Sequence, residues 1–157
     1  MTAATKHGAT AEIAQAIGDA LTEHGIDTSV ISPDQVRAID HYDAVILGSA
    51  VYAGHWLKPA KELVERLGNA LAARPVWLFS SGPIGDPPKP EEDPVDVAEI
   101  IEATQAREHR VFPGRLLKEQ LSFGEKALAL ALRAPEGDFR DWSEIKAWAT
   151  GIADALQ

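Results

Sequence analysis

The residues whose types and spacing best suit binding chemistry lie near the N-terminus, in the stretch Thr-Lys-His-Gly-Ala-Thr at positions 5–10. This stretch leads into a segment with apolar residues at helical spacing. Unpartnered backbone N–H groups converge at a helix N-terminus, and the helix dipole adds partial positive charge there. Gly8 permits a positive φ or a close backbone approach, and Thr10 can cap the helix. We therefore predict an anion site, although the same residue types also begin ordinary helices.

Two more loops with binding-type residues follow short apolar runs. Residues 49–56 come after the run Ala44–Leu47, and Ser80–Asp86 comes after Pro75–Phe79. Short apolar runs without alternation are typical of strands buried on both faces of a parallel sheet. Ligands of such sheets bind beyond the carboxyl ends of the strands. We therefore expect the three loops to meet at one edge of the sheet.

The chain alternates between apolar runs and amphipathic segments. Helices are predicted over Thr10–Glu23, Lys58–Ala73, Pro94–Thr104 and Asp141–Leu156, with strands at Asp27–Ile31, Ala44–Leu47, Pro75–Phe79 and His109–Phe112. This alternation indicates a single α/β domain over residues 1–157, a doubly wound parallel sheet with helices on both faces. The segment Leu116–Leu132 contains an apolar patch, Ala127–Leu132, which fits a buried helix, a dimer face or a site for a hydrophobic partner.

The predicted anion loop should follow a strand, yet only Met1–Ala4 precede it. Four residues make at best a short strand, and this one would occupy the middle of the sheet. We therefore expect a truncated first strand, and we expect the natural chain to begin upstream of Met1. An intact mass of the natural protein that matched residues 1–157 would contradict this expectation.

The net charge of −9 and the absence of Cys restrict the function. An acidic chain lacks the basic surface that binding to nucleic acid or anionic lipid requires. The lack of Cys excludes disulfides, iron–sulfur clusters and thiolate chemistry, and the His residues share no metal-ligand spacing, so we predict no metal site. We recognise no membrane-spanning run and no signal peptide, which favours a cytoplasmic protein.

With its three loops in order, the sequence resembles the flavodoxin-domain proteins, and in particular the menaquinone-dependent protoporphyrinogen IX dehydrogenase group. Residues 5–10 match the hydroxyl-x-x-Gly-x-Thr phosphate loop of that group. Residues 48–56 match its second loop, in which Gly-His-aromatic at positions 54–56 is the distinctive part. The residues Asp-Trp-Ser-Glu at 141–144 match the start of its C-terminal helix. Three matches in order are fairly specific for the group.

The resemblance implies a flavodoxin-like sheet with strand order 2-1-3-4-5 and bound FMN. It implies that the FMN phosphate is cradled by Thr5, Lys6, His7, Gly8, Ala9 and Thr10. It further implies that one edge of the isoalloxazine is flanked by Ser49, Ala50, Val51, Tyr52, Ala53 and Gly54. The other edge would be flanked by Ser80, Ser81 and Gly82, in the loop that runs on to Asp86. No catalytic residue is assigned.

The sequence departs from the group in three places. The first strand is short, and Ala53 stands where the group has an aromatic residue, with Tyr52 one position earlier. The region between Gly114 and Asp141 lacks the basic, aromatic-rich insertion of the quinone-linked dehydrogenase. This last departure bears more on membrane association and porphyrin chemistry than on FMN binding.

Several single residues have both a structural and a functional interpretation. Tyr52 and Trp56 could stack on the flavin, while Trp56 could equally staple the following helix to the core. His55 could donate a proton or simply hydrogen-bond at the helix entry. The spacing of Trp142 and Trp148 predicts core positions. An acidic lip, either solvated or facing a basic partner, is expected from Asp86, Glu91, Glu92 and Asp93.

Three functions remain open from the sequence. The first is an FMN-dependent oxidoreductase that moves electrons from a reduced organic substrate, with a porphyrinogen among the candidates, to a quinone or another acceptor. The second is a flavodoxin-type carrier that passes electrons between protein partners through its acidic surface. The third is a flavin-free interaction module of the same fold. The partner is accordingly a small molecule or a redox protein, and the oligomeric state is open.

Overall fold

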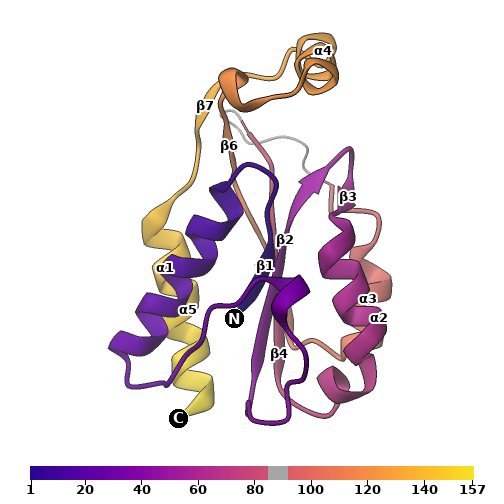
Figure 1. Cartoon of the computed structure of the whole chain (residues 1–157). Coiled ribbons are helices and arrows are strands. Elements are labelled where there is room, and N and C mark those ends of the chain that lie inside the picture. The colour runs from indigo at the N-terminus through magenta and orange to yellow at the C-terminus, as the bar shows by residue number, and fades with distance from the viewer. Residues whose placement is uncertain (85–91) are drawn as a thin grey trace.

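The protein is built on a parallel sheet whose strands lie in the order β1-β2-β4-β5 in a computed structural model that describes residues 1–84 and 92–157. The strands are β1 (Thr2–Ala4), β2 (Val45–Tyr52), β4 (Val76–Ser81) and β5 (Glu108–Phe112). A two-residue strand, β3 (His55–Trp56), pairs antiparallel with the end of β2. Figure 1 shows these strands running upward through the middle of the molecule. The α/β class, the parallel order of these strands and the short first strand are confirmed.

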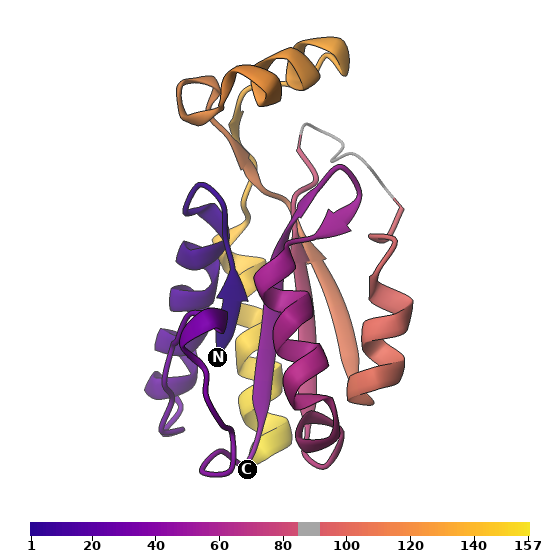
Figure 2. The ribbon, with the colours of Figure 1, turned by 45° about the vertical axis from the view of Figure 1, so that its right-hand side comes forward.

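Four helices cover the two faces of the sheet (Figures 1 and 2). Helices α1 (Ala9–Glu23) and α5 (Trp142–Leu156) lie on one face, and α2 (Lys58–Ala72) and α3 (Val97–Thr104) lie on the other. A single 3-10 turn, η1 (Pro33–Gln35), lies on the path from α1 to β2. The helix predictions are confirmed to within a few residues at each end.

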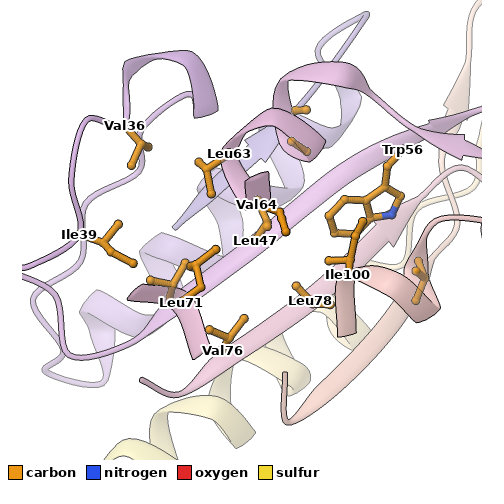
Figure 3. Close-up of a cluster of buried hydrophobic side chains, with 14 residues drawn as sticks. Val36, Ile39, Leu47, Trp56, Leu63, Val64, Leu71, Val76, Leu78 and Ile100 are labelled. Atoms are coloured by element: carbon orange, nitrogen blue, oxygen red, sulfur yellow. The ribbon is translucent and has the colours of Figure 1, made fainter. Parts of the chain in front are cut away.

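The strand residues alternate between two cores, as expected for a sheet buried on both faces. The core under α2 and α3, shown in Figure 3, contains Val36, Ile39, Leu47, Trp56, Leu63, Val64, Leu71, Val76, Leu78 and Ile100. The core under α1 and α5 contains Ile13, Ile17, Leu21, Ile46, Trp77, Phe79, Phe112, Ile145, Trp148 and Ile152. Within each of β2 and β4, successive side chains therefore enter different cores.

The predicted strand at Asp27–Ile31 does not form. The Met1 amino group donates to the Ser29 carbonyl at 3.0 Å, and the Ile31 N–H donates to the Met1 carbonyl at 3.0 Å. This is the pattern of one step of a parallel ladder. The next step of this ladder would need an N–H at residue 33, and Pro33 has none. The segment therefore lies beside β1, in the expected place, without becoming a regular strand.

The second predicted loop is mostly strand. β2 continues through Tyr52, and a turn at Ala53 and Gly54 leads directly into β3. Both turn residues have positive φ, 51° for Ala53 and 81° for Gly54. Two left-handed residues are what a tight two-residue hairpin connection requires. The prediction of a loop at residues 48–52 is therefore wrong, because the small and polar residues that suggested a loop are accommodated inside a buried strand.

The C-terminal helix begins as predicted, but one of its tryptophans does not enter the core. The Asp141 carboxylate accepts from the Glu144 N–H at 3.1 Å and so caps α5. Trp148 is buried against Phe79 and Phe112, with ring centroids 6.1 and 5.4 Å away. Trp142 keeps 38% of its surface exposed and stacks under the Arg140 guanidinium, 4.6 Å from the ring centroid. The core assignment is confirmed for Trp148 and wrong for Trp142.

An arm formed by residues 115–140 rises beyond the carboxyl ends of the strands (Figures 1 and 2). Its two stems, β6 (Arg115–Leu116) and β7 (Gly137–Asp138), pair antiparallel, and between them lie the 3-10 turn η2 (Lys118–Gln120) and helix α4 (Phe123–Ala131). The apolar patch of α4 is not buried, since Leu130 and Leu132 keep 76% and 70% of their surface exposed. Of the three interpretations of this patch, the buried helix is therefore wrong.

Within residues 1–84 and 92–157, none of the helices has the combination of length and apolar character that crossing a membrane would need.

A glycine in β2 lets the two central strands pack closely, and this contact predicts a stability effect. A Cβ atom on Gly48 would lie 2.2 Å from ring atoms of the buried Phe79. We expect Gly48→Ala to lower the free energy of unfolding by roughly 1–3 kcal/mol through overpacking. Chemical denaturation followed by circular dichroism measures the change.

Gly68 provides the matched control. It lies inside α2 with open space where its Cβ would be, so Gly68→Ala should raise stability by roughly 0.5–1 kcal/mol. A Gly48→Ala variant as stable as the wild type would contradict the packing described for β2 and β4.

Candidate cofactor site

The N-terminus of α1 has the geometry of an anion site. Gly8 is the N-cap residue with φ 90°, and no side chain of the described residues caps the helix. The Gly8 carbonyl accepts from the Glu12 N–H at 3.1 Å, which is the first helical hydrogen bond. The N–H groups of the first turn thus have no intrahelical acceptor. The Thr10 capping prediction is wrong, because Thr10 is already the second residue of the helix.

The turn before the helix is held by its own side chain. The Gly8 N–H donates to the Thr5 Oγ1 at 3.0 Å. Thr5 is exposed, and Thr10 is buried on the helix just beyond. Gly8 has a left-handed conformation, which a residue with a Cβ adopts only with strain.

A cavity of about 240 Å³ lies where the three predicted loops meet beneath the arm. The predicted site residues that line this cavity are Lys6, His7, Ala9, Thr10, Ala50, Val51, Tyr52, Ala53, Ser81 and Gly82. The structure therefore brings residues from all three loops together, as expected for the carboxyl edge of a parallel sheet. The remaining lining comes from Leu57, Ile84, Gly114, Arg115, Leu116, Leu121, Glu125, Leu128, Ala129, Leu132 and Ala134.

Five predicted site residues do not line this cavity: Thr5, Gly8, Ser49, Gly54 and Ser80. Thr5 and Gly8 hold the shape of the anion loop through the hydrogen bond between them. The buried Ser49 hydroxyl donates to the Ala50 carbonyl at 2.7 Å and accepts from the Leu57 N–H at 2.9 Å. The Gly54 carbonyl accepts from the Val95 N–H at 2.8 Å. These residues therefore fix the backbone of the loops that carry the lining residues.

Ser80 belongs to a buried polar chain in the core. The Trp56 indole N–H donates to the Ser80 hydroxyl at 2.8 Å, and that hydroxyl lies 2.7 Å from the His109 Nε2. Burial lowers the pKa of His109, and the charge of Asp93 only partly offsets this effect. A neutral His109 has one unprotonated ring nitrogen, so Nε2 can accept a hydrogen bond from the Ser80 hydroxyl. Trp56 is thus a core residue, as Figure 3 shows, and the stapling interpretation is confirmed over flavin stacking.

Two other predicted residues differ in their surroundings. Tyr52 is partly exposed at the cavity, and the Lys6 ammonium lies 4.1 Å from its ring centroid, which is a cation–π distance. His55 lies at the entry to α2, where its Nδ1 is 3.2 Å from the Asp96 carboxylate. The same carboxylate accepts from the Trp56 N–H at 2.9 Å. His55 therefore forms the helix-entry contact and lies outside the cavity lining.

The acidic lip falls only partly within the described residues. Asp86 and Glu91 lie outside the described residues, while Glu92 and Asp93 lie within them and are exposed. Among the described residues, no cluster of three or more His, Asp or Glu side chains is placed to hold a metal ion.

The arm contributes a buried carboxylate that the sequence did not indicate as a site residue. Glu125 of α4 is only 7% exposed, and its Oε2 lies 2.9 Å from the His7 Nε2 and 3.3 Å from the Lys6 Nζ. Burial raises the pKa of Glu125, but the hydrogen bonds from His7, Ser122 and Lys6 outweigh it and lower the pKa to about 2. The carboxylate is therefore ionised throughout the physiological range.

The arm is fixed at its base by arginines. Arg140 is 4% exposed and donates to Asp138 at 2.7 Å, to Glu12 at 3.2 Å and to the Ala9 carbonyl at 3.2 Å. Arg115 pairs with the same Glu12 carboxylate at 3.1 Å. The hydrogen bond from Arg140 is the largest cause of the lowered pKa of Asp138. These contacts connect both stems of the arm to the first turns of α1.

Backbone contacts hold the arm to the third loop as well. The Gly114 N–H donates to the Pro83 carbonyl at 2.7 Å, and the Phe139 N–H donates to the Gly114 carbonyl at 3.0 Å. A Cβ atom on Gly114 would lie 3.2 Å from the Gly82 Cα. The arm therefore begins at the wall of the cavity, with little space between the two backbones.

The sequence contained a partial signal for the missed residues. Ser122 and Glu125 form a capping box, with the Glu125 N–H donating to the Ser122 hydroxyl at 3.3 Å and the Ser122 N–H to Glu125 at 3.1 Å. The pattern Ser-x-x-Glu marks the start of α4 in the sequence. Where that helix lies relative to the anion loop could not be read from it.

The Flavodoxin domain family model matches residues 1–142. The chain belongs to the flavodoxin domain family. The protoporphyrinogen dehydrogenase group within the wider resemblance stays a prediction.

Solved structures share the flavodoxin fold with this chain. A flavodoxin from the domain Archaea aligns over 99% of this chain and 95% of its own, with a TM-score of 0.65 and 17% identity. Flavodoxin 1 from Bacillus cereus aligns over 100% and 97%, with a TM-score of 0.62 and 16% identity. Rubredoxin oxygen:oxidoreductase from Desulfovibrio gigas aligns over 99% of this chain and 35% of its own, with a TM-score of 0.67 and 12% identity. A comparison with curated proteins found no match.

The ion contacts of Glu125 predict a pH-dependent contribution to stability. Its pKa falls from an ordinary 4.5 to about 2, so its ionised form stabilises the fold above its ordinary pKa and this stabilisation is lost as the pH falls through about 2. We expect the free energy of unfolding to differ between the wild type and Glu125→Gln most above about pH 5, and the difference to vanish toward pH 2.

Urea denaturation at stepped pH, without added flavin, measures this difference. Glu119→Gln, which removes an exposed acid from the same arm, is the control and should leave the pH profile unchanged. A difference between wild type and Glu125→Gln that does not change with pH would contradict the ion contacts.

Proposed function

We propose that this flavodoxin-family chain is an FMN-dependent oxidoreductase whose phosphate site is the N-terminus of α1. The observation that supports it most strongly is the uncapped first turn of α1, whose residues Ala9 and Thr10 line the cavity just after a left-handed Gly8. A phosphate dianion supplies the acceptors that these donors lack, and the helix dipole stabilises its negative charge. The donor set thus fits the phosphate of FMN.

The isoalloxazine would lie between the second and third loops. Ala50, Val51, Tyr52 and Ala53 line the cavity together with Ser81 and Gly82, which adjoin them because Ala50 of β2 pairs with Ser81 of β4. Close approach of the ring to the backbone is favoured by the small residues of this lining, Ala50, Ala53 and Gly82. When bound, FMN would supply the electron-transfer chemistry, and the protein would supply the anchor, the pocket and the exclusion of water.

The arm favours a small apolar substrate over a purely protein-mediated exchange. Its side of the cavity is lined by Leu116, Leu121, Leu128 and Leu132, so a reactant beside the flavin would meet an apolar wall. A quinone-type acceptor suits such a wall, because its ring is flat and largely apolar. A porphyrinogen-type donor rests on the family resemblance alone.

The acidic surface favours a second candidate, an electron carrier between proteins. The arm contains five Lys or Arg residues and four Asp or Glu residues. The rest of the chain contains ten Lys or Arg residues and twenty Asp or Glu residues. The body therefore carries the negative charge that steers a basic redox partner.

Ionic strength separates the two candidates. Electron transfer to a basic protein partner should slow steeply between about 0.05 and 0.5 M salt, because charge steering is screened. Turnover of a small quinone should change little over the same range. Stopped-flow oxidation of the reduced flavoprotein by each acceptor gives the comparison, and quinone turnover with the steep salt dependence would contradict the oxidoreductase assignment.

The phosphate site itself is tested by a pair of glycines at the two ends of α1. Gly8 and Gly25 both have positive φ, 90° and 84°, and neither has an atom within 4 Å of its missing Cβ. Alanine in this conformation costs about 1–2 kcal/mol at either position. We expect Gly8→Ala to weaken FMN binding by roughly tenfold or more, since relief of the strain re-aims the first-turn N–H groups.

Gly25→Ala is the control. It should lose comparable stability and bind FMN as the wild type does, in a titration followed by quenching of flavin fluorescence. Equal FMN affinity for both variants and the wild type would place the phosphate elsewhere.

A further inference from the structure

The arm inserts a carboxylate into the region that a bound phosphate would use. Glu125 Oε2 contacts both the His7 Nε2 and the Lys6 Nζ, and these two residues flank the turn that leads to the N-terminus of α1. His7 and Lys6 also line the cavity, as does Glu125 itself. The carboxylate therefore already engages the two basic side chains that the loop presents to an anion.

A second negative group at this position is electrostatically unfavourable. A phosphate on the first turn of α1 would lie beside an ionised carboxylate in a partly desolvated cavity, where like charges repel more strongly than in water. The same phosphate would gain the Lys6 ammonium and the His7 ring as hydrogen-bonding partners if the carboxylate were removed, because both side chains would then be free to turn toward it. Glu125 and the phosphate thus compete for one set of partners.

We propose that Glu125 is a tethered competitor for the cofactor phosphate and so determines how strongly the site favours a phosphorylated flavin over an unphosphorylated one. This inference rests on the proposed function, since it takes FMN as the ligand of the site. Binding of FMN then requires the Glu125 carboxylate to leave Lys6 and His7, whereas riboflavin, which lacks the phosphate, binds without displacing it.

The attachment of α4 allows this displacement. Glu125 and Ala129 are the only buried residues of the helix, while Phe123 and Leu130 are largely exposed. The arginine contacts with Glu12 lie at the base of the arm and do not include Glu125. The stems are therefore held independently of Glu125, so displacement of its carboxylate leaves the contacts between the stems and α1 in place.

The test compares FMN with riboflavin on three forms of the full chain: wild type, Glu125→Gln and Glu119→Gln. Glutamine keeps the capping box of α4, because its side-chain oxygen also accepts from the Ser122 N–H, but it carries no charge. Glu119→Gln makes the same charge change on the same arm, at an exposed position. Isothermal titration calorimetry gives both affinities for each form.

We expect Glu125→Gln to bind FMN about tenfold more tightly than the wild type, or more, with riboflavin affinity unchanged within about twofold. Glu119→Gln should match the wild type for both ligands. Equal FMN affinity of wild type and Glu125→Gln would overturn the inference while leaving FMN binding intact. An equal gain for riboflavin would also overturn it, since the effect would then not arise from the phosphate.

Inorganic phosphate distinguishes failure of this inference from failure of the proposed function. If no form binds either flavin, amide chemical shifts of residues 8–11 are followed while inorganic phosphate is added. Tighter phosphate binding by Glu125→Gln than by the wild type would then support the competition and reject the flavin assignment. Identical phosphate affinity would overturn the competition as well.

Discussion

The uncapped N-terminus of α1 is the constraint on which the site depends. A helix that buries Thr10, Ile13 and Ile17 against the sheet must begin close to the carboxyl end of β1, and its first N–H groups then point out of the fold. Gly8 supplies the left-handed turn that lets the chain leave β1 and enter the helix within a few residues. The resulting cluster of donors needs an anion or water, and its surroundings determine which.

The surroundings are set by two other strand ends and by the arm. β2 and β4 end beside the loop, so their last residues form an adjoining wall of the cavity. The arm closes the remaining side with apolar residues and brings Glu125 to Lys6 and His7. Flavin chemistry requires such a setting, in which charge is placed at the phosphate and kept away from the ring. The site is therefore formed by one helix terminus, two strand ends and one helix of the arm.

The sequence was informative wherever local pattern decided the structure. Helical spacing located α1, α2 and α5, and the runs at Pro75–Phe79 and His109–Phe112 became β4 and β5 with small shifts. The convergence of the three loops could also be predicted, because carboxyl ends of parallel strands share one edge.

Pattern did not determine features that depend on distant partners. The segment Asp27–Ile31 is β-like in composition, yet it forms only one ladder step, with Met1, because Pro33 lacks the N–H of the next step. Ser80 looks like a loop hydroxyl, but it is held in the core by Trp56 and His109, which are far away in sequence. Glu125 meets His7 across 118 positions, a contact set by the path of the arm.

The most direct test of the central claim is the amide spectrum of the protein labelled with ¹⁵N, recorded with FMN and with riboflavin. If the N-terminus of α1 holds the phosphate, the N–H signals of residues 8–11 should shift strongly with FMN and little with riboflavin, since charge-assisted hydrogen bonds change amide shifts most. Both ligands should shift residues 50–53 and 81–82 alike. FMN-induced shifts that leave residues 8–11 untouched would contradict the account.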